Sequence, residues 1–516
     1  MTDNQRFALF SAWDKTGVAE QATILSNLGW TLISTGGTAR ALEDAGLEVI
    51  EISDLTGEPE RFDGRVKTLH PAIHAPLLAR RSISSDMDEL SQSSWNAIDL
   101  VHVDLYPFTD HSESKSLPEA VELIDIGGVA LLRAAAKNHT DVIVSCNLLT
   151  LTSIVQKLGM VAGNPSQIDL NYRLELAALS FTTTTAHDAA IADRLWREQI
   201  QNPQNRPFLL VTDPTESLRY GENPDQGASR HSILSPPSLH DGFSSMMEQH
   251  SGGPLSYNNL LDLEAAVRLA RGINSPSDSL IGCVIIKHNN PCGVAIAPTA
   301  KQAWMNALAS DKESAFGCVV AFTSTVDLAT SECIGDHFLE AIICPSIDPS
   351  ALVHLSRKER RRILTLNKSM GKGLASSIEF RSIEGSLLLQ QPSEDHAPGS
   401  FHSVGNIPIP PMDESSIRLG MTVTKWASSN CIVITQGNST VGIGPGQTSR
   451  VEAARIALRR AGQKSNGAVM WSDAFLPFPD TVEIAAEAGI STIVQPGGSI
   501  RDDAVTEAAD RLGVAM

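Results

Sequence analysis

FALFSAWDKTGVAEQATILSNLGWTLISTGGTARALEDA, residues 7–45, contains two strand patterns that alternate with two helix patterns. Residues 7–12 and 30–34 are short apolar runs, and each precedes a glycine-containing turn and a segment with helical periodicity. Further strand patterns occur at 47–52, 100–105 and 142–146. This βαβα order predicts a parallel, doubly wound α/β sheet over the first ~150 residues.

The remainder of the chain has a helical pattern, a linker and a weak internal duplication. Residues 167–199 have the helical pattern, and the polar, Pro-containing segment 201–207 is typical of a linker. Two units of similar order then follow, each made of an apolar strand, a polar turn, a second strand, a helix and a third strand: 283–322 and 431–470. The Pro/Ser-rich stretch 391–415 would connect them. The alternative is that the two units are alike by chance, because both have the common βαβ order of elements.

Bulk properties limit the function classes. The 516 residues are 42% hydrophobic and 19% charged, which is ordinary for a globular protein with two to four domains. No apolar stretch approaches the ~20 residues that span a bilayer, and the first residues have no pattern of a secretion signal. Seven cysteines without a close-spaced framework indicate reduced, cytoplasmic thiols. A net charge of −19 argues against nonspecific nucleic-acid binding.

The first half contains a lysine-bearing polar constellation. The Gly- and Pro-bounded loop 64–71 carries Arg65, Lys67 and Thr68, which suit a phosphate or a developing oxyanion, and a solvated basic loop is the alternative. Asp125 precedes two glycines and is a candidate catalytic carboxylate, helix cap or turn residue. Lys137 is on a predicted helix, where a lysine usually faces solvent.

The two turns after the first strands predict an anion cup. Backbone N–H groups at Thr35, Gly36 and Gly37, with a helix N-terminus behind them, suit a phosphate. The alternative is a tight turn with Thr38 as the N-cap of the helix. Lys15 follows the first strand at the same expected sheet edge, and it favours the phosphate interpretation.

A second constellation, Lys287-His288-Asn289-Asn290-Pro291, ends the apolar run 283–286. An imidazole titrates near neutrality and can act as a general base or acid, and the neighbouring ammonium would help to keep it neutral. A pair of residues that points to solvent at a strand end is the alternative. Two such sites in one chain favour a bifunctional enzyme. We predict no metal, because the zinc-deaminase pattern needs a cysteine three residues beyond Cys292 and none is there.

These segments, in this order, resemble the bifunctional purine-biosynthesis family that joins phosphoribosylaminoimidazolecarboxamide formyltransferase to inosine monophosphate (IMP) cyclohydrolase. The resemblance covers nearly the whole chain. The segments that carry it are 14–17, 36–39, 64–70, 124–128, 132–139, 219–221, 287–288, 314–317, 442–444, 446–447, 449–450, 472–475 and 495–502.

The resemblance implies an α/β architecture with an N-terminal methylglyoxal-synthase-like doubly wound parallel sheet, followed by two cytidine-deaminase-like α/β halves. It implies a cyclohydrolase domain at 1–200, a linker at 201–207 and a formyltransferase domain at 208–516, with halves at about 208–390 and 414–516. It further implies a cytoplasmic homodimer with transferase sites at the subunit interface, nucleotide and folate substrates, and no nucleic-acid or membrane partner.

For formyl transfer from 10-formyltetrahydrofolate, the resemblance assigns His288 to the amine proton. It assigns Lys287 and Asn430 to the oxyanion or the leaving folate nitrogen. Nucleotide-binding positions would be Arg219, Tyr220, Asn259, Gly317, Glu340, Arg450 and Phe475. Folate-binding positions would be Val451, Asp480 and Ser499.

For ring closure, the resemblance assigns catalysis to Lys67, Tyr106, Asp125 and Lys137, with proton transfer by Lys137 and electrostatic stabilisation by Lys67. Preorganising the intramolecular attack would supply much of the rate. The nucleotide would be held by Asp14, Lys15, Thr35, Gly36, Gly37, Thr38, Arg65, Thr68 and Asp104.

Several residues depart from the family pattern. Asp104 stands where asparagine is usual, and Trp13 replaces a small residue in the first phosphate loop. Other departures are Pro76, Asp225, Ser386 and Pro445, and the family continues beyond Met516 with a tail that helps to close the nucleotide site. Asp104 and Trp13 leave open a transferase whose cyclohydrolase is weakened. A nonenzymatic nucleotide-binding relative is the third hypothesis, which the joint presence of Lys67, Lys137, Lys287 and His288 disfavours. A methylglyoxal-synthase-like enzyme would explain only the first third.

Overall fold

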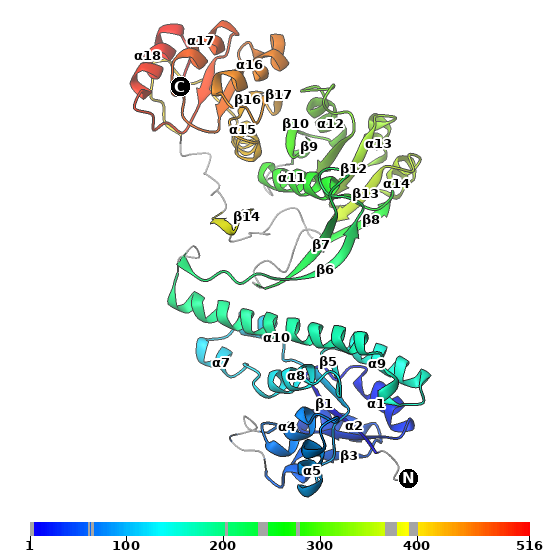
Figure 1. The fold of residues 1–516 in the computed structure, drawn as a ribbon. Helices are drawn as coiled ribbons and strands as arrows, with labels where there is room; N and C mark the ends of the chain where they lie inside the picture. The colour runs from blue at the N-terminus through cyan, green and yellow to red at the C-terminus, as the bar shows by residue number, and fades with distance from the viewer. Residues whose placement is uncertain are drawn as a thin grey trace. The chain divides into compact units, whose positions relative to one another are not determined.

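The structure is a computed structural model that describes residues 5–59, 62, 67–201, 205–235, 246–274, 279–366, 379–391 and 401–516 (Figure 1). The chain divides into two compact units. Unit 1 comprises Met1–Asp213 with Ile233–His240, and unit 2 comprises Pro214–Ser232 with Asp241–Met516. The division passes through the two-stranded sheet of β6 (Val211–Leu218) and β7 (Ala228–Ser235).

Unit 1 contains a five-stranded sheet in the order β3-β2-β1-β4-β5, and every pair in it is parallel. Its strands are β1 (Arg6–Ala12), β2 (Trp30–Ser34), β3 (Val49–Glu51), β4 (Leu100–Asp104) and β5 (Ile143–Ser145). The predicted doubly wound parallel sheet is confirmed. The strand order reverses between β1 and β4, and ligands of open α/β sheets bind at such a point.

Helices connect the strands of unit 1 and bury their apolar faces on the sheet. They are α1 (Val18–Asn27), α2 (Gly36–Asp44), α3 (Ile52–Thr56), α4 (Pro71–Leu78), α5 (Ser84–Gln92), α6 (Phe108–Ser112), α7 (Leu117–Val121), α8 (Gly127–Lys137), α9 (Leu148–Met160), the 3₁₀ turn η1 (Pro165–Gln167) and α10 (Leu170–Gln199). The side chain of Asp169 accepts a hydrogen bond from the Tyr172 N–H at the start of α10, which packs against α8 (Figure 1). The apolar core includes Phe7, Leu9, Phe10, Leu32, Val101 and Leu131.

Unit 2 is built on a ten-stranded mixed sheet in the order β19-β18-β16-β17-β10-β9-β11-β12-β13-β8. In chain order these strands are β8 (Met247–Ser251), β9 (Ile281–Lys287), β10 (Asn290–Ala297), β11 (Cys318–Phe322), β12 (Leu339–Cys344), β13 (Arg362–Leu366), β16 (Ile432–Gln436), β17 (Ser439–Gly444), β18 (Val469–Ser472) and β19 (Thr492–Val494). A separate two-stranded sheet is formed by β14 (Glu379–Ile383) and β15 (Ser386–Gln390).

The helices of unit 2 lie between these strands in the chain. They are α11 (Tyr257–Ile273), α12 (Ala300–Leu308), α13 (Leu328–Ile334), α14 (Pro349–Leu355), α15 (Glu414–Trp426), α16 (Arg450–Ala461), the 3₁₀ turn η5 (Gly462–Ser465), α17 (Asp480–Glu487) and α18 (Asp502–Leu512). Among the described residues, no helix is long and apolar enough to cross a membrane.

The predicted duplication is visible in the ten-stranded sheet. Each half has an antiparallel hairpin, β9–β10 or β16–β17, followed by an antiparallel neighbour and then a parallel one. Each hairpin also has a glycine at the fourth position of its second strand. A Cβ on Gly293 would lie 2.0 Å from the Ala307 carbonyl oxygen, and one on Gly442 would lie 2.1 Å from that of Ala457. The halves therefore pack a helix against a hairpin in the same way, and β10 and β17 join them into one sheet.

All seven cysteines are unpaired, and all except Cys333 are buried. Burial raises the pKa of the Cys292, Cys318 and Cys344 thiols to about 12. These thiols are protonated at neutral pH and contribute to the apolar core.

Candidate active sites

The first site lies at the carboxyl ends of β1 and β4 in unit 1. The two strands pair up to Ala12 and Asp104, and beyond them the Trp13 N–H donates to the Asp104 carbonyl at 3.1 Å. The Asp14 N–H donates to the Asp104 carboxylate at 2.9 Å. The loop after β1 is therefore fixed to the end of β4 at the point where the strand order reverses.

A glycine turn and two lysines form a cationic cradle beside this loop. Helix α2 begins at Gly36, whose φ is +56°, and a Cβ there would lie 2.6 Å from the Lys67 ammonium. A Cβ on Gly37 would lie 3.3 Å from Lys15 Cε. The absence of side chains lets both lysines approach the helix N-terminus, whose N–H groups and dipole favour an anion.

The hydroxyl of Thr38 has a structural role. The hydroxyl accepts from the Ala12 N–H and donates to the Ala12 carbonyl, both at 3.0 Å, and the residue is buried. It joins α2 to the end of β1. The interpretation of Thr38 as an N-cap is wrong, because the helix begins at Gly36 with Thr35 at the N-cap. The positive φ that Gly36 accepts allows this early start.

A second helix N-terminus carries Thr68 and Asp125. A carboxylate oxygen of Asp125 accepts from the Gly128 N–H at 2.8 Å at the start of α8. A Cβ on Gly127 would lie 2.7 Å from the Thr68 hydroxyl, so the loop before α4 reaches this helix end. The two glycines after Asp125 are therefore required by close contacts.

Tyr106 belongs to an aromatic cluster with Trp13 and His111. The Trp13 and Tyr106 ring centroids lie 4.1 Å apart at an interplanar angle of 67°. His111 lies 5.3 Å from Tyr106 and 5.9 Å from Trp13. The sequence patterns gave no reason to place His111 in the site.

The charges at the end of β4 are unusual for an anion site. Burial raises the pKa of Asp104, an effect that the Asp14 N–H and Lys15 oppose. Hydrogen bonds from Thr16 lower the pKa of Asp14. The Lys15 ammonium donates to the carbonyls of Ala12 and Trp13 at 3.2 and 2.8 Å, so it is held at this strand end.

Two predicted residues of this site are not placed with the others. Lys137 is the last residue of α8, about 15 Å along the helix axis from Gly127 at a rise of 1.5 Å per residue. It therefore does not join Asp125 within one chain. Arg65 lies outside the described residues.

The second site is on the β9–β10 hairpin of unit 2. Lys287 pairs with Asn290, and the two residues between them, His288 and Asn289, have φ values of +50° and +61°. Positive φ at both central positions defines the turn type that fits tight hairpins. The Lys287 ammonium donates to the Phe316 carbonyl at 2.7 Å. The Lys-His pair is therefore on a short turn with a fixed backbone.

An acidic residue of α11 holds this turn. The Asp262 carboxylate accepts from the Asn289 N–H at 2.7 Å. Burial raises the pKa of Asp262, which the backbone N–H groups of Asn289 and His288 oppose. The sequence patterns gave no reason to place Asp262 in the site, because they did not predict the helix that carries it.

Asn430 lies in a second polar network, before β16. Its side-chain oxygen accepts from Arg450 at 2.6 Å, and its side-chain nitrogen donates to the Gln447 carbonyl at 2.8 Å. Arg450 also pairs with Asp473, whose carboxylate accepts from the Cys431 N–H at 3.1 Å. Asp473 was missed as an anchor, since it is more than forty residues from Asn430 in the chain.

The hairpin and the Asn430 network are joined directly. The Asn290 side-chain oxygen accepts from the Ser428 N–H at 2.9 Å, two residues before Asn430. The hairpin turn of the first half thus meets the segment that precedes the first strand of the second half, and Lys287, His288 and Asn430 belong to one neighbourhood of unit 2.

The remaining predicted nucleotide positions are distributed around unit 2. Asn259 is buried in the capping box of α11, Glu340 pairs with Arg362 at 2.9 Å, and Gly317 has a φ of +68°. The Arg219 guanidinium lies 5.5 Å from the centroid of the Tyr220 ring. Phe475 is exposed just after the Ser472–Asp473 pair.

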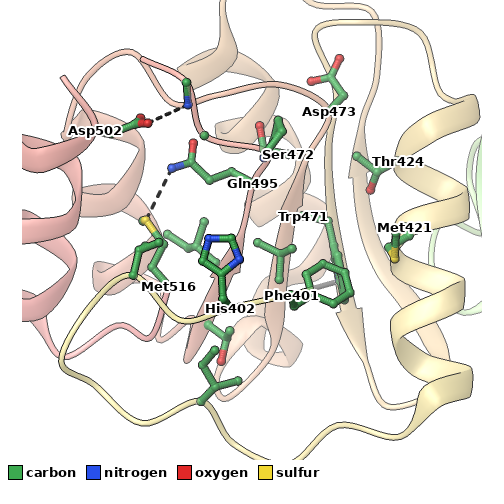
Figure 2. A pocket seen from close by; sticks show the side chains of 18 of the residues that line it. Phe401, His402, Met421, Thr424, Trp471, Ser472, Asp473, Gln495, Asp502 and Met516 are labelled. Atoms are coloured by element: carbon green, nitrogen blue, oxygen red, sulfur yellow. Dashed lines mark hydrogen bonds between the residues drawn. The ribbon is translucent and has the colours of Figure 1, made fainter. Parts of the chain in front are cut away.

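A cavity of about 1600 Å³ opens beside Asp473 (Figure 2). Figure 2 shows Phe401, His402 and Trp471 around it, with Asp502 accepting from the Gly498 N–H and Gln495 donating to the Met516 sulfur. The predicted folate positions Val451, Asp480 and Ser499 do not line this cavity. Ser499 is nevertheless next to it in the chain, and its N–H also donates to Asp502.

Comparisons with known proteins identify the family. The model of the AICARFT/IMPCHase bienzyme family matches residues 135–460, and that of the MGS-like domain matches 17–130. The bifunctional purine biosynthesis protein PurH of Chloroflexus aurantiacus is 43% identical over 99% of this chain and 96% of its own length. PurH of Bacillus subtilis is 40% identical over 99% of this chain and 97% of its own length.

The chain belongs to the AICARFT/IMPCHase bienzyme family.

As a member of the AICARFT/IMPCHase family, the chain is a bifunctional enzyme with formyltransferase and IMP cyclohydrolase activities, which catalyse the last two steps of IMP synthesis. The formyltransferase activity uses a folate cosubstrate. The N-terminal MGS-like architecture expected from the sequence is confirmed. Within the described residues, no cluster of three or more His, Cys, Asp or Glu side chains is arranged to hold a metal ion.

Proposed function

We propose that formyl transfer takes place at the β9–β10 hairpin and ring closure at the end of β1 and β4. In the transfer, the amine of the aminoimidazolecarboxamide nucleotide attacks the formyl carbon of 10-formyltetrahydrofolate. His288 accepts the amine proton, while Lys287 stabilises the tetrahedral oxyanion or the departing folate nitrogen. The proposal also includes a cytoplasmic homodimer, with transferase sites shared between subunits.

The hydrogen bond between Ser428 and Asn290 is the observation that supports the transfer site best. It places Asn430 near the Lys287-His288 turn, although about 140 residues separate them in the chain. One hydrogen of the Asn430 side-chain amide is used by Gln447, and the other remains to donate to an oxyanion. Arg450 holds the oxygen of the same amide, which fixes its orientation.

In the ring closure, the carboxamide nitrogen of the formamido nucleotide attacks the formyl carbon, and the carbinol oxygen leaves as water. The turn of Gly36 and Gly37, with Lys15, holds the phosphate. Lys67 offsets negative charge on the carbinol oxygen, and Asp125 and Tyr106 orient the reacting groups. Thr35 precedes the start of α2, and the Thr68 hydroxyl lies beside the start of α8.

The proton-transfer role of Lys137 requires a second chain. Lys137 is at the far end of α8 from Asp125, so its ammonium would act in the site of a partner subunit. The proposed homodimer permits this arrangement. For the folate side we retain Val451, Asp480 and Ser499. The Ser499 N–H donates to Asp502, which lines the cavity beside Asp473.

A weakened cyclohydrolase is the second candidate function. The Asp104 carboxylate accepts from the Asp14 N–H at the edge of the phosphate cradle, and it adds a negative charge beside an anionic ligand. This negative charge weakens the binding of the anionic nucleotide, and the positive charge of Lys15 offsets part of the repulsion.

Product analysis tests the proposal. The full chain is incubated with the aminoimidazolecarboxamide nucleotide and 10-formyltetrahydrofolate, and the formamido intermediate and IMP are quantified by mass spectrometry. Wild-type protein should form IMP without accumulating the intermediate, and Lys67→Ala should accumulate it. Accumulation by the wild-type protein would instead support the weakened cyclohydrolase. If Lys67→Ala lost the transfer and kept the ring closure, the assignment of the two sites would be wrong.

A further inference from the structure

The aromatic cluster at the end of β1 contains a residue whose role has no assignment so far. Trp13 is 46% exposed, although tryptophan is usually among the more buried residues. The indole packs against Tyr106 and His111, whose ring centroids lie 4.1 Å and 5.9 Å from that of Trp13. The indole is therefore packed on one side and open on the other.

The backbone of Trp13 is held in place at both ends. Its N–H donates to the Asp104 carbonyl at 3.1 Å, and its own carbonyl accepts from the Lys15 ammonium at 2.8 Å. The same ammonium lies 5.8 Å from the indole centroid. Since the main chain is fixed, only the two side-chain torsions determine where the ring lies, and the contact with Tyr106 restricts both.

The neighbours of the Tyr106 ring include two aromatic side chains. Tyr106 follows β4 at the sheet edge, it is half-buried, and Trp13 and His111 are the rings in contact with it within the described residues. A catalytic hydroxyl must be held within a fraction of an ångström of its productive position, so the neighbours of the ring influence the rate.

We propose that Trp13 is a positioning residue of the cyclohydrolase site: its edge-to-face contact holds the Tyr106 ring, and its open face stacks on the planar base of the formamido nucleotide. The proposal rests on the assignment of ring closure to this strand end. The stacked base is an imidazole in the substrate and a purine in the product, and both have the flat face that an indole binds. A small residue at position 13 would offer neither contact.

The test is steady-state cyclisation of the formamido nucleotide by the full chain. Trp13→Ala should lower kcat about 3- to 10-fold, the range for losing one aromatic pair, and Trp13→Phe should restore most of it. Trp196→Ala is the matched control, because Trp196 is also in unit 1 and 39% exposed, on α10. Formyl transfer should be equal in all four proteins.

A double-mutant cycle separates positioning from general damage. In a Tyr106→Phe background, Trp13→Ala should lower kcat by less than it does in the wild-type background, because the hydroxyl that Trp13 positions is already absent and only the stacking contact is lost. An equal loss in both backgrounds, or no loss in either, would overturn the positioning role. An unaffected Tyr106→Phe would overturn it together with the role of Tyr106. A wild-type chain that forms no IMP would contradict the proposed function itself.

Indole fluorescence tests the stacking contact. Addition of IMP should quench the emission of the wild-type protein, and this change should be absent in Trp13→Phe. An equal quench in Trp13→Phe would assign the signal to another tryptophan and overturn the stacking role.

Discussion

The two candidate sites differ in how their polar groups are held. In unit 1, separate segments each bring one or two groups to the ends of parallel strands and to two helix N-termini, as with Lys15, Lys67 and Asp125. In unit 2, one two-residue turn carries His288 next to Lys287, and hydrogen bonds from other elements hold it. The first site therefore takes its polar groups from many segments, whereas the second has its two main side chains on one turn. A single side-chain change should therefore be most harmful in the second.

The largest effect is expected for His288→Asn. Asparagine tolerates the positive φ of this turn, so the substitution removes the imidazole and leaves the backbone unstrained. Formyl transfer should fall by about 10²–10⁴, the range for loss of a general base. Initial rates with saturating folate measure it.

The same variant contains its own control. Its cyclisation of added formamido nucleotide should equal that of the wild-type protein, because the lysine cradle is in unit 1. A transfer rate within threefold of wild type would show that the hairpin is only a structural turn. The two sites would then no longer differ in how strongly they depend on one side chain.

The next effect is expected for Gly36→Ala. Its Cβ would lie 2.6 Å from the Lys67 ammonium and would displace it from the helix N-terminus. The cyclisation kcat/KM should fall by about 10- to 100-fold, as expected for losing a charge-assisted contact to the nucleotide. The readout is cyclisation of added formamido nucleotide across a substrate range.

Gly46→Ala is the matched control for this change. Gly46 has a φ of +82° and no atom within 4 Å of its Cβ position. It should lose about 1 kcal/mol of stability from the left-handed backbone, as Gly36→Ala should, without loss of activity. Equal activity of the two variants would show that the lysine cradle does not bind the nucleotide.

The smallest effect is expected for Asp104→Asn. An amide oxygen still accepts from the Asp14 N–H, and the negative charge beside the nucleotide is removed. The KM of ring closure should fall about 2- to 5-fold, which corresponds to a partly exposed charge interaction. A KM that stays the same or rises would show that Asp104 does not oppose the nucleotide.

The stability of this variant should depend on pH in a defined direction. Because burial raises the pKa of Asp104 above its ordinary 3.8, the folded wild-type protein holds a proton that the unfolded chain has already released. Wild-type stability therefore falls as the pH rises through this interval, and asparagine has no such loss. The melting temperature of Asp104→Asn relative to wild type should increase from pH 3.5 to pH 7, and an unchanged difference would contradict the shift.

Sequence patterns predicted the strands of unit 1 to within one or two residues. Strand β2 was predicted with its observed bounds, because a buried parallel strand is apolar and a glycine turn ends it. The prediction for β3 was too long at both ends, since Leu47 and Ile52 are apolar for another reason: they pack against the core from a loop and from α3. Hydrophobicity reports burial, and it does not distinguish a strand end from the residue after it.

The sites were predictable where a fold rule brings residues together. The approach of Lys15 to the Gly37 turn follows from parallel strands that end at one edge. The position of Lys67 over Gly36 does not, because it comes from a loop without periodicity. The contacts among Asn430, Arg450 and Asp473 depend on which strands of the mixed sheet are neighbours, and no local pattern contains that order.

The burial of the cysteines allows unfolding to be followed by thiol labelling. Six of the seven thiols are buried in the native state, and Cys333 alone is partly accessible. A maleimide pulse therefore labels one site on a folded molecule and seven on an unfolded one, so the mass of the labelled chain counts how much has opened. Because six of these thiols are in or near the ten-stranded sheet and Cys146 is in unit 1, peptide mapping of the label would show which unit opens first.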